Sequence, residues 1–168
     1  VYRANEQFVE AEEAYSRALD LIEDERTSHW VLYYYRGITS ERSDQWDGAD
    51  ADFRRALELN PNQPLVLNYL GYSLVELRQN LDEAHAMIEK AVVQRPDDGY
   101  ITESLGCVLY SIGKYQEPVT LMEQAVDFLP WDTIINDHLG DVLWKVGRKL
   151  EAEFQWRRAL SFEPEEED

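Results

Sequence analysis

The sequence contains few of the residues on which several classes of protein depend. Cys107 is the single cysteine among 168 residues, so the chain can form no internal disulfide. Lysine and arginine total 16 against 34 acidic residues, and the net charge of -18 argues against binding to nucleic acid or to an anionic membrane surface. No apolar run approaches the roughly 20 residues that cross a bilayer. We therefore expect neither nucleic-acid binding nor direct membrane insertion.

The chain also lacks the features of a disordered or secreted precursor. Glycine and proline are sparse, at 8 and 6 residues, while apolar and aromatic residues are plentiful enough to build a core. The sequence starts at Val1 with no initiator methionine and no signal-peptide pattern, and we interpret it as a piece of a longer protein. The excess of acidic residues has two interpretations. It attracts a basic partner, or it only keeps the scaffold in solution.

Three residue types recur with one period along the chain. Four glycines follow each other at intervals of 34, 35 and 34 residues, namely Gly37, Gly71, Gly106 and Gly140. Alanines and prolines recur in the same phase, as Ala56, Ala91, Ala125 and Ala159, and as Pro61, Pro96, Pro130 and Pro164. Glycine inside a helix costs about 1 kcal/mol, so we expect a second helix to approach closely at each one. Large residues then fill the remaining space, namely Phe53, Ile88, Met122 and Trp156.

This pattern resembles the tetratricopeptide repeat, a helix-turn-helix unit of about 34 residues with the signature L-G-x2-Y, A-x3-F and P. The second copy reads Leu70-Gly71-x2-Leu74 and Ala84-x3-Ile88, and the last reads Leu139-Gly140-x2-Leu143 and Ala152-x3-Trp156. The resemblance implies an all-α fold, a right-handed α-α superhelix of stacked repeats. We expect a partial repeat at 1–26, full repeats at 30–63, 64–98, 99–132 and 133–164, and an acidic tail at 165–168.

The repeat phase predicts helices near 4–22, 30–43, 47–59, 64–78, 81–94, 98–112, 115–128, 132–146 and 149–161. The link from Glu23 to Ser28 is four residues longer than the period requires, which predicts a longer helix or a changed packing angle there. Pro118 occupies a position that alanine fills in the other repeats. We expect it in the first helical turn, where its missing N–H does no harm.

In this family the first helices of the repeats line a concave face that binds an extended peptide or a helix. Carried over to this chain, the face comprises Tyr34, Ile38, Asn68, Tyr69, Tyr72, Glu103, Cys107, Tyr110, Asp137, Asp141 and Trp144. Asn68 alone matches the residues with which some relatives clamp a C-terminal carboxylate, so we expect an aromatic groove with acidic edges instead. Its partner would be an apolar segment with Lys or Arg nearby. Packing between repeats is the alternative role for each tyrosine.

Catalytic motifs are missing from the sequence, and we expect no enzyme activity, no cofactor and no metal. Asp137, His138 and Asp141 form a compact polar cluster, but two carboxylates and one imidazole match a dedicated metal site poorly. We interpret this cluster as a solvated helix face. Cys107 is interpreted as a small buried or groove-lining residue, and its pairing in space with a histidine stays open.

The sequence thus predicts a protein-interaction scaffold or adaptor. The alternative is self-assembly into a homodimer, because the last helix carries Phe154, Trp156 and Leu160 with no polar capping helix after it. The segments 69–75 and 135–144 resemble the C-terminal repeats of large bacterial envelope proteins of this family. That resemblance favours a periplasmic location, with the cytoplasm as the alternative.

Overall fold

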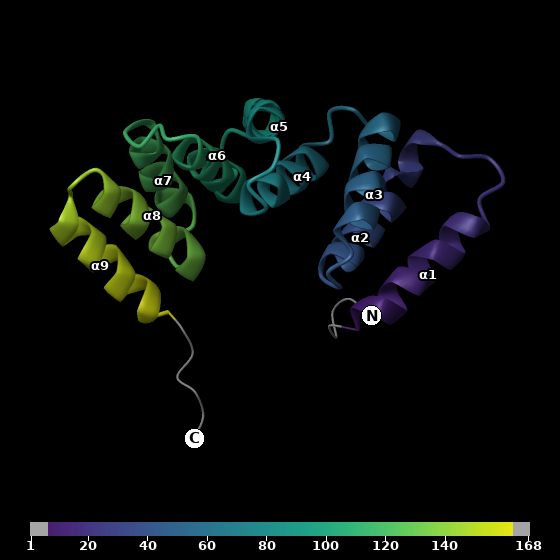
Figure 1. The fold of residues 1–168 in the computed structure, drawn as a ribbon, viewed down its shortest axis with the longest axis horizontal. Coiled ribbons are helices and arrows are strands. Elements are labelled where there is room, and N and C mark those ends of the chain that lie inside the picture. The colour runs from purple at the N-terminus through teal and green to yellow at the C-terminus, as the bar shows by residue number, and fades with distance from the viewer. Residues whose placement is uncertain (1–6, 163–168) are drawn as a thin grey trace, which may run out of the picture. The chain divides into compact units, whose positions relative to one another are not determined.

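The computed structural model describes residues 7–162. Within them the chain forms α1 (Phe8–Asp20), the 3-10 turn η2 (Thr27–His29), α2 (Trp30–Glu41), α3 (Trp46–Leu59), α4 (Pro64–Glu76), α5 (Leu81–Gln94), α6 (Gly99–Ser111), α7 (Glu117–Phe128), α8 (Thr133–Lys145) and α9 (Lys149–Leu160), and no strand (Figure 1). The fold is an all-α array of repeated helix pairs. It divides into two units, residues 1–70 and 71–168, and the boundary between them in the sequence falls within α4.

The predicted helices are confirmed, with ends that differ by a residue or two in most cases. The interval 81–94 coincides with α5, whereas α1 is shorter than predicted and ends at Asp20. The extended link after α1 therefore does not lengthen that helix, and its last part forms η2 instead. The expected tail at 165–168, Pro164 and the start of the partial repeat at 1–6 lie outside the described residues.

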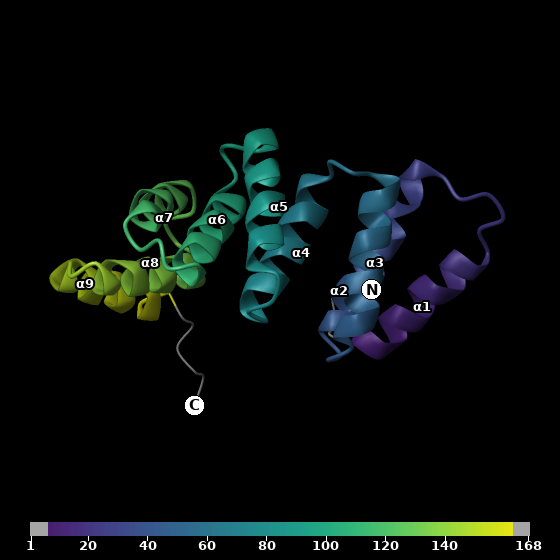
Figure 2. The same cartoon turned by 45° about the horizontal axis from the view of Figure 1, so that its top comes forward.

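The N-terminal unit is built on α2 and α3, which pack against each other along their length, and α1 packs on α2 (Figures 1 and 2). Its core contains Tyr34, Ala49, Phe53 and Ala56, of which the last three are wholly buried. The three alanine and phenylalanine positions on α3 are three, four or seven residues apart, so they lie on one face of that helix.

Each periodic glycine lies where the second helix of its repeat comes closest. A methyl group placed on Gly37 would lie 2.7 Å from the ring of Phe53, and one on Gly140 would lie 2.3 Å from the indole of Trp156. The same construction at Gly106 meets the end of Met122 at 2.7 Å. These separations are far below van der Waals contact, so the predicted pairing of a small residue with a large one is confirmed.

The turns between the two helices of a repeat share one conformation. Asp44, Arg78, Gly113 and Gly147 recur at 34- to 35-residue intervals, and all have positive φ, from 53° to 89°. In each turn the next residue donates its N–H to a carbonyl five residues earlier, as Lys114 does to Leu109 at 3.0 Å. This geometry ends the first helix with its last carbonyls satisfied. Two of the four positions hold residues other than glycine.

The C-terminal unit continues the same scheme from α5 to α9, with each helix lying beside the next (Figure 2). Its core includes Met122, Ile135, Leu139 and Leu143. Asp98 and Asp132, one repeat apart, accept hydrogen bonds from the N–H groups of the first turns of α6 and α8 at 3.3 and 3.0 Å. These caps fix where the first helices begin. Pro118 lies in the first turn of α7, as predicted.

None of the helices formed by residues 7–162 has the length and apolar character needed to cross a membrane.

Candidate functional site

In the N-terminal unit two predicted groove tyrosines belong to the aromatic core. Tyr34 is buried, and its ring lies 5.9 Å from that of Tyr69 in an edge-on arrangement. The ring of Tyr69 also packs on Phe53 at 5.2 Å, and its hydroxyl donates a hydrogen bond of 2.7 Å to Glu41. Burial, helped by the bond to Glu41, raises the pKa of Tyr69. These contacts give both rings a packing role inside the unit.

Ile38 and Asn68, the other predicted residues of this unit, are half-buried. The Oδ1 atom of Asn68 is buried and has no hydrogen-bond partner among the residues that the structure describes. A buried amide oxygen without a partner costs free energy, so this position of Asn68 is unfavourable to folding.

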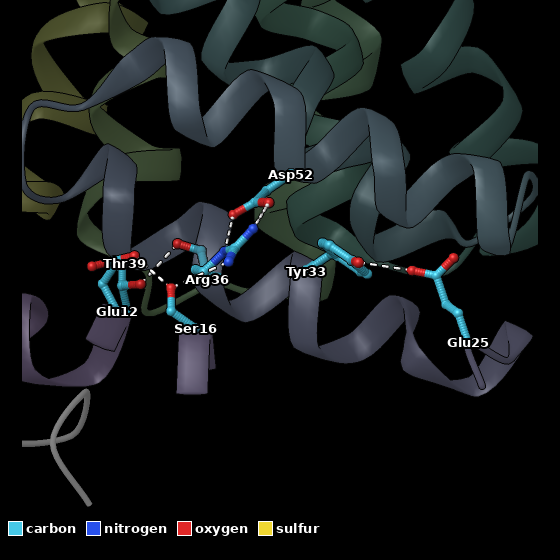
Figure 3. A network of polar contacts seen from close by, with 7 residues as sticks. All are labelled: Glu12, Ser16, Glu25, Tyr33, Arg36, Thr39 and Asp52. Carbon is cyan, nitrogen blue, oxygen red and sulfur yellow. Dashed lines mark hydrogen bonds and ion pairs between the residues drawn. The ribbon is translucent and has the colours of Figure 1, made fainter. Parts of the chain in front are cut away.

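A polar network joins α1, α2 and α3 around Arg36 (Figure 3). The guanidinium donates two hydrogen bonds of 2.7 Å to the buried carboxylate of Asp52 and one of 3.2 Å to the hydroxyl of Ser16. Nearby, Tyr33 donates to Glu25 at 2.7 Å. The bond with Asp52 raises the pKa of Arg36, and this bidentate pairing holds three helices together. The network is therefore a structural device.

The C-terminal unit has a cavity of about 290 Å³, which we call the C-terminal hollow. Residues of α4, α6, α7 and α8 and of the turn after α4 line it, namely Val75, Glu76, Arg78, Cys107, Tyr110, Ser111, Met122, His138, Asp141 and Val142. The lining combines apolar side chains with two exposed carboxylates, those of Glu76 and Asp141. It therefore suits a side chain that has an apolar stem and a positive end.

Cys107 and His138 of the hollow's wall contact each other and the neighbouring Glu103. Glu103 and Cys107 lie one turn apart on α6, and Cys107 Sγ is 2.9 Å from Glu103 Oε1. From α8, the Nδ1 atom of His138 lies 2.6 Å from the same Oε1 and 3.6 Å from Cys107 Sγ. Glu103 is buried, with only 6 % of its surface exposed. The structure thus brings Cys107 and His138 together, a pairing that the sequence left open.

The electrostatics of this cluster follow from burial and negative charge. Burial, followed by the carboxylate of Glu103, raises the pKa of Cys107 well above that of a free thiol. The hydrogen bond with Glu103 raises the pKa of His138, against the lowering effect of burial. The thiol is therefore protonated in this environment, which makes Cys107 a poor nucleophile.

Of the remaining predicted residues, Tyr72 is half-buried, and burial followed by the charge of Glu103 raises its pKa. Asp137 is exposed and does not line the hollow. Trp144 packs on Trp156 at 5.5 Å between ring centres and has Lys149 over its face at 4.8 Å. Asp137 and Trp144 both lie on α8 and outside the hollow.

The prediction of the groove residues missed Arg78 and Met122. Arg78 enters the hollow from the turn after α4, the turn that holds the one-residue insertion in the sequence. Met122 belongs to a second helix, and its side chain passes close over Gly106, which has no side chain to exclude it. The lack of a side chain at Gly106 was the sequence signal for this close approach of Met122.

Comparison with known proteins agrees with the fold. The sequence model of the tetratricopeptide repeat matches residues 30–63. A TPR repeat-containing protein of Pseudomonas aeruginosa is 32% identical over 83 residues, which are 49% of this chain and 14% of that protein. Residues 30–63 therefore carry a tetratricopeptide repeat. The chain spans only a seventh of the length of this relative.

Solved structures of other tetratricopeptide-repeat proteins have the same fold. A MamA double mutant matches with a TM-score of 0.76 at 20% identity, over 90% of this chain and 84% of that one. PilF of Pseudomonas aeruginosa matches with a TM-score of 0.80 at 18% identity, over 98% and 72%. YrrB, described as a TPR protein with an unusual peptide-binding site, matches with 0.70 at 19% identity, over 98% and 82%.

The repeat family sets the general class of function. Tetratricopeptide repeats mediate protein–protein interactions, and proteins built from them are generally scaffolds without catalytic activity. Their stacked helix pairs create extended binding surfaces from the first helices. In this chain the C-terminal hollow lies on such first helices, α4, α6 and α8.

Proposed function

We propose that the chain is a protein-interaction module that binds a segment of a partner protein in the C-terminal hollow. The observation that carries this proposal is a cavity of about 290 Å³ lined from the first helices of three successive repeats. Neighbouring repeats present Val75, Tyr110 and Val142 to the same space, so an extended segment could contact all three. The peptide-binding description of YrrB, which shares the fold, supports the same role here.

The lining indicates the chemistry of the partner. Val75, Met122 and Val142 provide an apolar surface, while Glu76 and Asp141 provide exposed carboxylates. The whole chain carries a net charge of -18, which attracts basic segments over distances of about the Debye length, roughly 8 Å at physiological salt. The proposed ligand is therefore an apolar residue next to Lys or Arg.

The test is a fluorescence-anisotropy titration with peptides that pair apolar residues with Lys or Arg, taken from an array screened on the wild-type chain. In the double variant Glu76→Gln/Asp141→Asn we expect about 10-fold weaker binding and a smaller salt dependence. The double variant Asp97→Asn/Asp127→Asn removes the same charge from exposed positions outside the hollow and should bind like the wild type. Equal binding by both double variants would exclude the hollow as the site.

A second variant tests the aromatic contact. Tyr110 is half-buried in the hollow, with its ring 5.2 Å from that of Tyr115. Removal of an aromatic anchor from an interface commonly costs about 2 kcal/mol, so Tyr110→Ala should weaken binding roughly 30-fold. Circular dichroism must show an unchanged helix content in this variant. The variant series leaves Tyr69 unchanged because it packs in the core of the N-terminal unit.

Self-association is the second candidate function, and exposed apolar residues on α9 favour it. Leu150 and Phe154 lie one turn apart on that helix and have 82% and 63% of their surfaces exposed. Light scattering at increasing protein concentration tests the idea, with Leu150→Glu/Phe154→Glu as the variant that should stay monomeric. A wild-type chain that is monomeric at every concentration excludes it.

A further inference from the structure

The cluster of Glu103, Cys107 and His138 has a composition that peptide binding does not require. It combines a carboxylate, a thiol and an imidazole, and one ligand atom from each lies within 4.8 Å of the others. Two of the residues come from consecutive turns of α6 and the third from α8, so the helices hold them in fixed relation. Thiol, imidazole and carboxylate are the three side-chain groups with which proteins bind Zn²⁺.

The distances suit a tetrahedral ion. Zn–S and Zn–N bonds of about 2.3 and 2.0 Å at tetrahedral angles place sulfur and nitrogen roughly 3.5 Å apart. Cys107 Sγ and His138 Nδ1 are 3.6 Å apart. Glu103 Oε1 lies closer, at 2.9 Å from the sulfur and 2.6 Å from the nitrogen. A shift of its carboxylate by about 1 Å, which a change of side-chain torsion supplies, completes a three-ligand set.

The charges of the cluster also suit a divalent cation. Glu103 is buried, and Glu76 and Asp141 add negative potential around Cys107. A dication bound by one thiolate, one carboxylate and one neutral imidazole forms a group without net charge, so the buried carboxylate of Glu103 stays compensated. The positive charge of the ion stabilises the thiolate, and the thiol proton is released to solvent as the ion binds.

We propose that Glu103, Cys107 and His138 form a binding site for Zn²⁺ or another thiophilic divalent cation. Three protein ligands leave the fourth position for water or for a donor from a bound segment. Cys107 and His138 both line the C-terminal hollow, so this position is open toward it. The proposal does not depend on peptide binding, because the three ligands belong to this chain.

Cobalt spectroscopy gives a direct test, since Co²⁺ replaces Zn²⁺ in such sites and is coloured. Cys107 is the single cysteine, so any thiolate-to-cobalt charge-transfer band in the near ultraviolet reports this residue. The protein is reduced, freed of metal and of any affinity tag, and titrated with Co²⁺. We expect the band together with visible bands of tetrahedral intensity, saturation at one Co²⁺ per chain, and loss of all bands when Zn²⁺ is added.

Two variants test the ligands, and a third serves as the control. Cys107→Ser should abolish the charge-transfer band, and His138→Ala should weaken cobalt binding by more than about 10-fold. His85→Ala removes another half-buried helical histidine, one that lies outside the cluster beside Glu89, and should titrate like the wild type. Circular dichroism establishes that each variant is folded.

The wild-type titration decides first, because the absence of a charge-transfer band at excess Co²⁺ refutes the site without any variant. Saturation at half an equivalent would show one ion shared by the cysteines of two chains and would overturn a site within one chain. If a folded His138→Ala variant keeps the full charge-transfer band and the wild-type affinity for Co²⁺, the assignment of His138 as a ligand is wrong.

Discussion

Replacement of Gly37 by alanine tests how strictly the repeat depends on its periodic glycine. An added methyl group would lie 2.7 and 2.9 Å from two ring carbons of Phe53, where carbon atoms normally stay about 3.5 Å or more apart. Phe53 is wholly buried, and its ring contacts Tyr69 and Tyr34 at 5.2 and 6.3 Å between centres. The ring has no space into which to move, so the backbones of α2 and α3 must separate.

Two opposing effects set the size of the change. Alanine favours a helix over glycine by about 1 kcal/mol. Overpacking of a tight core costs about 1–3 kcal/mol, and the confinement of Phe53 favours the upper part of that range. The difference predicts that Gly37→Ala lowers the free energy of unfolding by roughly 1–2 kcal/mol.

Gly48→Ala is the matched control. Gly48 is an exposed residue of α3, and a methyl group built there meets no atom within 4 Å. Only the helix preference acts at this position, so the variant should gain up to about 1 kcal/mol. Urea unfolding followed by circular dichroism gives both values from the shift of the midpoint. The reasoning is refuted if Gly37→Ala is as stabilising as the control.

Two further predictions concern an ion pair and a turn. Asp52→Asn leaves the half-buried guanidinium of Arg36 without its carboxylate and should lower the free energy of unfolding in urea by roughly 2–3 kcal/mol. Asp50→Asn breaks an ion pair within one helix and should lower it by about 0.5 kcal/mol or less. Similar losses in the two variants would contradict a special role for the Asp52 contact. Arg78 has a φ of 53°, so Arg78→Gly should raise the midpoint of thermal unfolding by relieving about 1 kcal/mol of backbone strain. Gly113 has a φ of 87°, so Gly113→Ala should lower the midpoint. A shift of both midpoints in the same direction would exclude backbone strain as the cause.

The scaffold could be predicted from the sequence because each of its features depends on a repeated local pattern. The pairing of Gly37 with Phe53 follows from the phase of the glycines and the spacing to the next large residue. The ends of α5 follow from the turn before Leu81 and from Pro96 after Gln94. The link after α1 has no equivalent in the other repeats, so the period predicted its extra length but not the 3-10 turn that it forms.

The candidate site could be predicted only in part because it depends on how neighbouring first helices face each other. Cys107 and His138 are 31 residues apart, and one residue of helix rotation turns a side chain by about 100°. The sequence placed both residues on first helices but left their mutual orientation open. The prediction of aromatic groove residues was limited for the same reason. Tyr69 has the spacing of a groove residue, but its ring packs inside the N-terminal unit.

The contacts in the structure show a rule that supplies the missing orientation. Glu41 follows its periodic glycine by four residues, and it contacts Tyr69, which precedes the next periodic glycine by two. Cys107 follows Gly106 by one residue, and it contacts His138, which again precedes the next glycine by two. In both contacts, residues that follow the periodic glycine of one first helix touch a residue that precedes the periodic glycine of the next first helix.

This rule separates the positions that fix the fold from those that are free to carry function. The glycine and the large residue opposite it are constrained by close approach in every repeat, whatever the chain binds. The positions one and four after the glycine, and two before the next, are constrained only to fit each other. In the N-terminal unit they hold a tyrosine and a glutamate that form one hydrogen bond. In the C-terminal unit the position one after the glycine holds a thiol and the position two before the next holds an imidazole, beside a buried carboxylate, so the same scaffold there presents metal-binding chemistry instead of a packing contact.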